Sequence, residues 1–216
     1  MSRVYCAACQ LPQTACLCAY VRPQPCPMPV IIYQHPLEAK HAKSTVPLLR
    51  LGLQAADPSA LNSSGLSSSK KAQPSLTITV AEQLPSPPPL ASGDWWLLYP
   101  DAQALDLDAQ QGENLLQAKK DIGGLIVLDG TWRKTRLLLH LNPWLSDLPK
   151  LTFSEAAGSL YAIRKGPGGQ ALSTLESVSH VLNRLHPEFM AAPLHDLLAA
   201  RVAQFQGQAA AKAEHK

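Results

Sequence analysis

Long apolar runs are missing from this sequence of 216 residues: none approaches the ~18 residues that a membrane-spanning helix needs. The N-terminus also lacks the basic segment followed by an apolar core that marks a secretory leader. Strong charge is missing as well, since the net charge is +3 and the pI is near 8.6. The sequence therefore predicts a cytoplasmic protein with no membrane segment, and its charge permits a nucleic-acid partner without requiring one.

Cysteine is scarce, but four of the five cysteines are crowded near the N-terminus. A reducing compartment disfavours a disulfide framework, so we interpret these thiols as metal ligands. Cys6-x-x-Cys9 and Cys16-x-Cys18 place four thiolates close enough to surround one ion tetrahedrally. The pattern predicts a zinc knuckle with a closed, structural site. Cys26, which lies between prolines, is interpreted as a spare thiol.

Short apolar segments alternate with helical patterns along the rest of the chain. The sequence predicts strands at residues 30–33, 76–80, 94–99, 125–128, 151–153 and 160–163. It predicts helices after Ser44-Thr45, at 113–120, after Asp129, after Ser173-Thr174 and at 194–205. Such alternation is typical of an α/β fold, here with a mainly parallel sheet, helices on both faces and the knuckle in front.

At this length we expect one α/β domain and a small appendage. The predicted parts are the knuckle at 1–28, the main domain at 29–207 and a flexible tail at 208–216. Within the main domain, residues 57–93 are rich in Ser, Pro, Gly and Lys, which predicts loops or partly disordered connectors around one strand. Gly123-Gly124 is interpreted as a turn. The loop at 166–169 fits a plain turn, because it has neither a G-x-G-x-x-G nor a Walker pattern.

The strongest functional signal is the turn that follows the strand at 125–128. The apolar run stops at Asp129, Gly130 permits a tight turn, and Thr131 is predicted as the N-cap of the next helix. Ligands of open α/β sheets bind outside the carboxyl ends of the strands, where Asp129 would lie.

Spacing alone leaves two interpretations of this turn. An aspartate in such a turn is often only a cap, and basic residues after it are often only a solvated helix face. Trp132 favours a site, because it places an aromatic ring beside Asp129 and beside cations at Arg133, Lys134 and Arg136. An acid, an aromatic ring and cations suit a nucleobase and its phosphate.

Asp129-Gly130-Thr131-Trp132 resembles the D-x-T-W signature of the DTW-domain proteins, the tRNA-uridine aminocarboxypropyltransferases. Further segments similar to that family are His35-Pro36-Leu37-Glu38, Leu98-Tyr99-Pro100 with Ala102, Ser173-Thr174-Leu175-Glu176 and the cysteine knuckle. They cover most of the chain in the expected order, whereas the Ser- and Pro-rich middle does not resemble a shared core. The resemblance implies a SPOUT-like fold whose C-terminal part forms a trefoil knot that holds S-adenosylmethionine.

The resemblance also implies an activity. The enzyme would transfer the 3-amino-3-carboxypropyl group of S-adenosylmethionine to N3 of a tRNA uridine, in the variable loop, and release methylthioadenosine. Uracil N3 is a poor nucleophile while protonated, so a carboxylate beside it can act as general base, and Asp129 is the candidate. The sulfonium already activates the carbon, so the transfer itself needs no metal.

The implied cofactor-binding residues are Tyr99, Pro100, Thr131 and Trp132. Further site candidates, with no derived role, are His35, Glu38, Ser173, Thr174 and Glu176. The predicted RNA-binding cations are Lys40, Lys43, Arg133, Lys134, Arg136, Arg164 and Lys165. Two other classes stay open: a SPOUT-like RNA methyltransferase, and a non-catalytic zinc protein that binds RNA.

Overall fold

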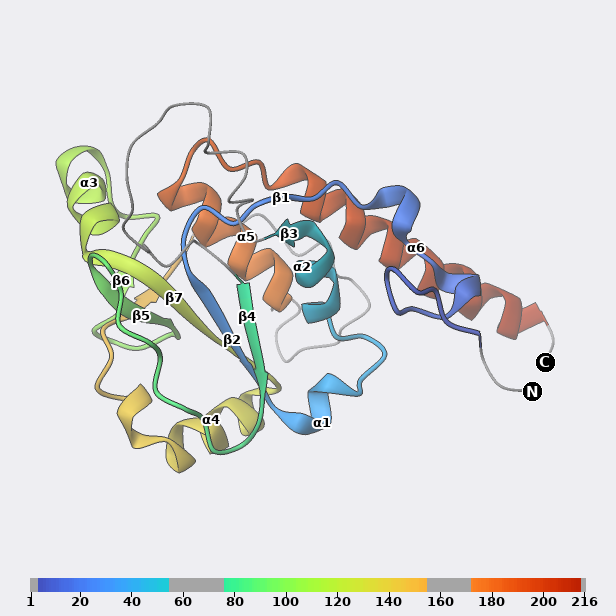
Figure 1. The fold of residues 1–216 in the computed structure, drawn as a ribbon, viewed down its shortest axis with the longest axis horizontal. Coiled ribbons are helices and arrows are strands. Elements are labelled where there is room, and N and C mark those ends of the chain that lie inside the picture. Colours follow the sequence, from blue (N-terminus) through green and yellow to red (C-terminus); the bar gives the residue numbers. More distant parts are fainter. Residues whose placement is uncertain (1–3, 55–75, 155–171, 215–216) are drawn as a thin grey trace, which may run out of the picture.

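The computed structural model describes residues 4–54, 76–154 and 172–214. Its centre is a six-stranded sheet in the order β4-β2-β7-β5-β8-β6, and every neighbouring pair is parallel (Figure 1). The strands are β2 (Val30–Gln34), β4 (Leu76–Val80), β5 (Asp94–Leu98), β6 (Leu105–Asp106), β7 (Ile122–Asp129) and β8 (Lys150–Thr152). The predicted α/β fold with a parallel sheet is confirmed.

The helices are α1 (Pro36–Ala39), α2 (Val46–Gly52), α3 (Gly112–Asp121), α4 (Trp132–Leu141), α5 (Thr174–Leu185) and α6 (Ala192–Glu214). Short 3-10 helices are η1 (Gln13–Ala15), η2 (Cys18–Tyr20) and η4 (Pro143–Leu145), and β1 (Gln24–Pro25) pairs with β3 (Leu53–Gln54) in a small second sheet. In the part of the chain that the structure describes, no helix is both long and apolar enough to cross a membrane.

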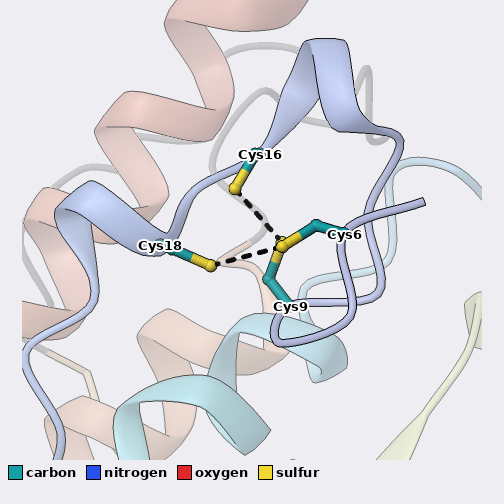
Figure 2. Close-up of side chains that lie close together, drawn as sticks. All are labelled: Cys6, Cys9, Cys16 and Cys18. Atoms are coloured by element: carbon teal, nitrogen blue, oxygen red, sulfur yellow. Dashed lines mark hydrogen bonds between the residues drawn. The ribbon is translucent and has the colours of Figure 1, made fainter. Parts of the chain in front are cut away.

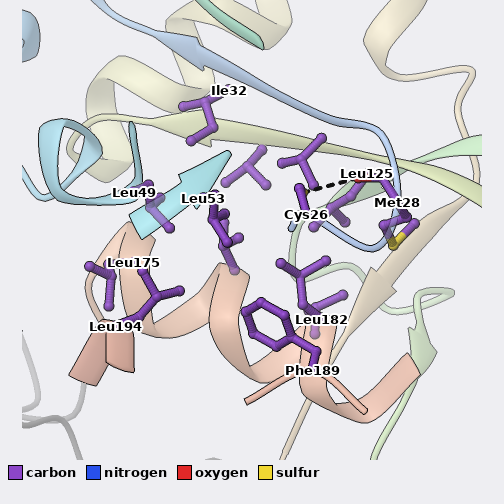
Figure 3. Packing of buried hydrophobic residues seen from close by; sticks show 14 of the residues in the cluster. Cys26, Met28, Ile32, Leu49, Leu53, Leu125, Leu175, Leu182, Phe189 and Leu194 are labelled. Carbon is purple, nitrogen blue, oxygen red and sulfur yellow. Dashed lines mark hydrogen bonds between the residues drawn. The ribbon is translucent and has the colours of Figure 1, made fainter. Parts of the chain in front are cut away.

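The side chains of the central strands alternate between two cores, as the pleat of a strand requires. On β7, Leu125 and Val127 enter one core, whereas Ile126 and Leu128 enter the other. The larger core packs the sheet against α2, α5 and α6 (Figure 3). The smaller core covers the opposite face with α4 and η4 and contains Leu138. Because both faces are buried, the central strands are continuously apolar.

Two glycines that the sequence analysis placed in a turn lie inside β7 instead. A Cβ atom on Gly124 would lie 2.5 Å from the ring of Trp95, and one on Gly123 would lie 2.0 Å from the carbonyl oxygen of Ser92. The glycines therefore permit a close approach between β7 and the segment of its neighbour β5, and such close approach is one reason for glycine inside a strand. Sequence reasoning also missed the two-residue strands β1, β3 and β6.

The loop between β4 and β5 is better packed than its composition suggested. Leu84 is buried, and its backbone N–H donates a hydrogen bond to the side-chain oxygen of Asn142 at 2.7 Å. Tyr33 and Trp95 donate hydrogen bonds to the carbonyl oxygens of Pro85 and Pro88, both at 2.7 Å. This half of the predicted connector therefore covers the smaller core. The other half, before β4, lies outside the described residues.

The C-terminal helix is longer than expected. It continues through Gly207 to Glu214, through most of the predicted tail, because the alanine, glutamine and lysine residues there are good helix formers and one glycine costs only about 1 kcal/mol. The predicted strand at 160–163, the loop at 166–169, Arg164 and Lys165 lie outside the described residues.

Candidate active site at the carboxyl edge of the sheet

The predicted strand end at Asp129 meets a second strand end in the sheet. Gln34, the last residue of β2, is paired in register with Asp129, the last residue of β7. The side chain of Gln34 donates a hydrogen bond to Oδ2 of Asp129 at 2.8 Å, and the backbone N–H of His35 donates to the carbonyl oxygen of Asp129 at 3.0 Å. Both chain exits are therefore locked together at the edge where ligands bind in parallel sheets.

Asp129 is buried and accepts hydrogen bonds on both carboxylate oxygens. The hydroxyl of Thr174, the first residue of α5, donates to Oδ1, while Gln34 donates to Oδ2. Gln34 also donates to the hydroxyl oxygen of Ser44 at 2.9 Å. Only 3% of Asp129 is exposed, so its orientation is fixed by the three elements that surround it. Sequence reasoning missed Gln34, although a polar residue in the last position of a buried strand was the available signal.

The turn after Asp129 is tight enough to require glycine. A Cβ atom on Gly130 would lie 3.1 Å from Cβ of Lys134 and 3.7 Å from Cβ of His35. Thr131 is the N-cap residue of α4, as predicted, but its side chain makes no capping hydrogen bond with the described residues. Trp132 then begins the helix with about half of its surface exposed.

Trp132 and Tyr99 are brought together from neighbouring strand ends. Their ring centroids lie 6.0 Å apart with an interplanar angle of 75°, an edge-to-face contact. Pro100 follows and is exposed. The aromatic pair therefore stands beside the buried carboxylate on the same edge of the sheet, and about half of Trp132 stays exposed, as stacking on a base would require.

His35 has a structural role at the exit of β2. Its Nδ1 accepts a hydrogen bond from the backbone N–H of Leu37 at 3.2 Å and so caps α1. Since Nδ1 accepts, Nε2 carries the ring proton and faces Glu82 at 3.4 Å. Glu82 lies in the loop after β4, so the imidazole joins two strand exits.

Glu38 forms an ion pair with Lys134, one of the predicted RNA-binding cations. Its carboxylate is buried and lies 2.7 Å from Nζ of Lys134 on α4. Lys134 therefore holds the start of α4 against α1, while 25% of its side chain stays exposed. Arg133 and Arg136 are exposed on the outer face of α4.

The two lysines predicted near α1 differ in exposure. Lys40 is exposed and Lys43 is half-buried. Ser173 and Glu176 make a reciprocal capping box at the start of α5, with the backbone N–H of Ser173 donating to Glu176 at 2.7 Å. The capping interpretation holds for this pair, and Thr174 is the member of the segment that reaches Asp129.

The four clustered cysteines converge as predicted (Figure 2). Their sulfur atoms all lie within 4.8 Å of one another, with Cys6 and Cys18 3.6 Å apart and Cys9 and Cys16 3.8 Å apart. Tetrahedral zinc with bonds of about 2.3 Å to sulfur needs sulfur atoms about 3.8 Å apart. All four cysteines are free thiols, and these separations exceed the disulfide bond length of about 2.05 Å. The donor set and spacing therefore fit one metal ion.

The local electrostatics of the cluster also suit a cation. Backbone N–H groups of Cys9 and Ala8 lower the pKa of the Cys6 thiol to about 6. Hydrogen bonds with Cys16 and Cys6 raise the pKa of the Cys18 thiol to about 12. One thiolate forms easily, and its negative charge then disfavours ionisation of the next thiol. A bound dication offsets this repulsion between thiolates.

The cysteine cluster is attached to the main domain through apolar packing. Leu17 is fully buried in the larger core, and the segment lies beside α6 (Figure 1). Gln204 of α6 donates a hydrogen bond to the carbonyl oxygen of Cys16 at 3.5 Å, and Arg50 of α2 donates to the side chain of Gln10 at 3.0 Å. Loss of the cluster would therefore disturb the surface of α6 as well.

The chain is similar to proteins named as tRNA-uridine aminocarboxypropyltransferases. The tRNA-uridine aminocarboxypropyltransferase 2 of Mus musculus is 31% identical over 186 residues, and that of Macaca fascicularis is 29% identical over 185 residues. Each match covers 85% of this chain and 57% of the relative, so the chain spans little more than half the length of these two proteins. The tRNA-uridine aminocarboxypropyltransferase A of Arabidopsis thaliana is 24% identical over 206 residues, which is 86% of this chain and 74% of the relative.

No solved structure matches the chain. The family model of the DTW domain matches residues 3–206, which include the cysteine cluster, both strand exits and α5. Because that match covers nearly the whole length, the chain belongs to the DTW domain family.

Proposed function

We propose that the protein transfers the 3-amino-3-carboxypropyl group of S-adenosylmethionine to N3 of a tRNA uridine. The observation that carries the proposal is the buried Asp129 carboxylate, held between two strand ends beside an exposed tryptophan, in a chain that matches the DTW domain. The names of its relatives support the same reaction class. The product on the RNA is 3-(3-amino-3-carboxypropyl)uridine, and the uridine is one of the variable loop.

The chemical step requires one proton acceptor and one fixed geometry. N3 of the uracil gives its proton to Asp129 and forms a bond to the γ-carbon of the transferred group. The bond between that carbon and the sulfonium breaks, and its electron pair leaves with neutral methylthioadenosine. Gln34 and Thr174 each occupy one acceptor position of Asp129, and a carboxylate oxygen can accept more than one hydrogen bond. The two donors therefore orient the base and leave it able to accept a proton.

The remaining residues position the two substrates. Tyr99, Pro100, Thr131 and Trp132 line the part of the edge assigned to S-adenosylmethionine, and the exposed ring of Trp132 is the stacking surface. Arg133 and Arg136 meet RNA phosphates, because both are exposed next to that ring. Orientation matters most, since the γ-carbon rather than the methyl carbon must face the base.

The cysteine cluster holds a structural zinc ion in this proposal. Cys6, Cys9, Cys16 and Cys18 supply all four ligands, so the ion keeps no open position and takes no part in the transfer. A SPOUT relationship, with a trefoil knot in the C-terminal part, is a further part of the proposal. It is supported by the resemblance of the motifs rather than by the described residues.

The test is the reaction itself, run with purified protein, S-adenosylmethionine and unmodified tRNA. We expect nucleoside mass spectrometry to find the aminocarboxypropyl adduct of uridine and chromatography to find methylthioadenosine in equal amount. A methylated nucleoside with S-adenosylhomocysteine would instead indicate a methyltransferase. Retained tRNA binding without either product would indicate a non-catalytic RNA-binding protein. Mapping of the adduct by nuclease digestion identifies the modified uridine.

A further inference from the structure

A second polar cluster lies at the carboxyl edge of the sheet, away from the Asp129 network. Asp108 follows β6, and its side chain is only 5% exposed. Nε2 of His180, on α5, lies 2.9 Å from Oδ1 of Asp108, and the backbone N–H of Ser154 donates to Oδ2 at 3.1 Å. The imidazole also packs against Phe153, with ring centroids 4.7 Å apart. A buried carboxylate therefore fixes a half-buried histidine.

The tautomer of His180 follows from its partner. A carboxylate only accepts, so Nε2 carries the proton and donates to Asp108, which leaves Nδ1 of the neutral ring as an acceptor. Within residues 4–54, 76–154 and 172–207, nothing donates to Nδ1, and 26% of the side chain is exposed. The ring is thus held in one orientation with its acceptor unused by these residues.

A guanidinium lies one helical turn further along α5. Nε and Nη2 of Arg184 donate hydrogen bonds to the carbonyl oxygens of Leu107 and Gln110, and Nε lies 3.7 Å from Asp108. These bonds fix the plane of the guanidinium, and Nη1 makes no hydrogen bond with the described residues. An acceptor backed by negative charge and a fixed cation therefore stand side by side.

The cluster lies at the far end of the same edge as Asp129. Thr174, which contacts Asp129, precedes His180 by six residues, or about 9 Å along the helix axis. The strands between them are β5 and β8, and the backbone N–H of Tyr99 donates to Leu151 of β8 at 3.1 Å. The helix α5 therefore connects the two clusters along one edge of the sheet.

We propose that His180, Asp108 and Arg184 form the subsite for the amino-acid end of S-adenosylmethionine; this rests on the proposed function. An ammonium group has donors and no acceptor, so it donates to Nδ1 of His180, and the charge of Asp108 favours a cation there. A carboxylate suits the guanidinium of Arg184. The separation of about 9 Å from Thr174 leaves room for the γ-carbon and the uracil between the subsite and Asp129.

The decisive experiment is calorimetric titration of S-adenosylmethionine and methylthioadenosine, a ligand that lacks the amino-acid end and the charge on sulfur. In His180→Phe, which keeps an aromatic ring against Phe153, we expect the Kd for S-adenosylmethionine to rise about 10- to 100-fold, the effect of one hydrogen bond to a charged group. The Kd for methylthioadenosine should stay within about twofold, because that ligand has no ammonium or carboxylate. The matched control is His186→Phe at the C-cap of the same helix. The ring of His186 faces the exposed Glu188, so this substitution should change the Kd of neither ligand.

A third ligand separates the two charged partners. Decarboxylated S-adenosylmethionine keeps the ammonium, so His180→Phe should weaken it, whereas Arg184→Met should weaken only the ligand that carries the carboxylate. Equal weakening of S-adenosylmethionine and methylthioadenosine in His180→Phe, or no weakening of either, would overturn the subsite. If the wild-type protein binds no S-adenosylmethionine, the proposed function itself fails, and this subsite fails with it.

Discussion

The substitution Asp129→Asn separates a catalytic base from a structural carboxylate. Asparagine keeps the shape of the side chain but replaces one acceptor oxygen with a donor. Its oxygen can accept from Gln34, and its amide can then donate to the hydroxyl oxygen of Thr174, which rotates to accept. Both contacts survive as neutral hydrogen bonds. Since charge-assisted bonds are about twice as strong as neutral ones, we expect a loss of about 1–2 kcal/mol in the free energy of unfolding.

The effect on activity should be much larger than the effect on stability. A positioned general base contributes about a hundred- to ten-thousandfold to the rate, so single-turnover rates of aminocarboxypropyl transfer should fall by that factor. The Kd values for tRNA and S-adenosylmethionine should stay near those of the wild type. Raising the pH should partly restore the rate of the variant, because uracil N3 then loses its proton to solvent without help.

The matched control is Thr174→Val, which removes the hydroxyl that donates a hydrogen bond to Asp129 and keeps the Asp129 carboxylate. If Asp129 is the base, this variant should lose stability by a similar amount but lose much less activity than Asp129→Asn. Near-normal turnover in Asp129→Asn, or equal losses of activity in both variants, would refute the assignment. Asp129 would then be a residue that holds α5 against β7.

Four further predictions follow from other parts of the molecule. Metal analysis should find one zinc ion per chain. The variant Cys9→Ser should lose the ion and unfold first in the N-terminal region, since structural zinc contributes on the order of 10 kcal/mol to the folding of small modules. An unchanged zinc content and melting temperature in this variant would contradict the prediction. Burial raises the pKa of the Cys26 thiol from 9.0 to about 11, so its stabilising effect is present below pH 9 and is lost as the pH rises to 11. Urea unfolding should therefore show wild type losing up to about 2–3 kcal/mol more than Cys26→Ala over that range, and parallel curves would exclude the effect. Arg136→Met should weaken tRNA binding, measured by filter binding, and reduce the salt dependence of that binding. Lys134→Met should instead lower the free energy of unfolding in urea by about 1.5–3 kcal/mol, because it removes the cation beside Glu38. If Lys134→Met weakened tRNA binding and left stability unchanged, Lys134 would be an RNA contact. Removal of residues 62–69 should leave turnover nearly intact, and a folded variant with a large loss of activity would mean that this segment meets RNA.

Local patterns in the sequence were sufficient to predict the parallel sheet and the position of Asp129 at a strand end. Apolar runs such as Val30 to Tyr33 and Leu125 to Leu128 indicate strands that are buried on both faces. The apolar pattern itself can be identified from neighbouring residues in the sequence. The cysteine spacing likewise predicted the cluster, because four ligands within one short segment can converge without help from the rest of the fold.

The partners of these residues depended on the tertiary structure. Gln34 reaches Asp129 because β2 and β7 are adjacent in the sheet, although 95 positions separate the two residues in the sequence. Lys134 has the pattern of a solvated helix cation, yet α1 brings the buried Glu38 to within 2.7 Å of it. Gly123 and Gly124 have the sequence pattern of a turn, but in the fold they lie in β7, where Ser92 and Trp95 leave no room for a Cβ atom.

The physical reason is the range of the interactions. Secondary-structure patterns, caps and closely spaced metal ligands are set by residues a few positions apart, so the sequence alone determined them. Strand order, and with it the choice of residues that surround a carboxylate at the sheet edge, is set by packing both faces of the sheet at once, with α2, α5 and α6 on one side and α4 on the other. Only the tertiary structure could therefore decide that Asp129 meets Gln34 and Thr174, and that Asp108 meets His180.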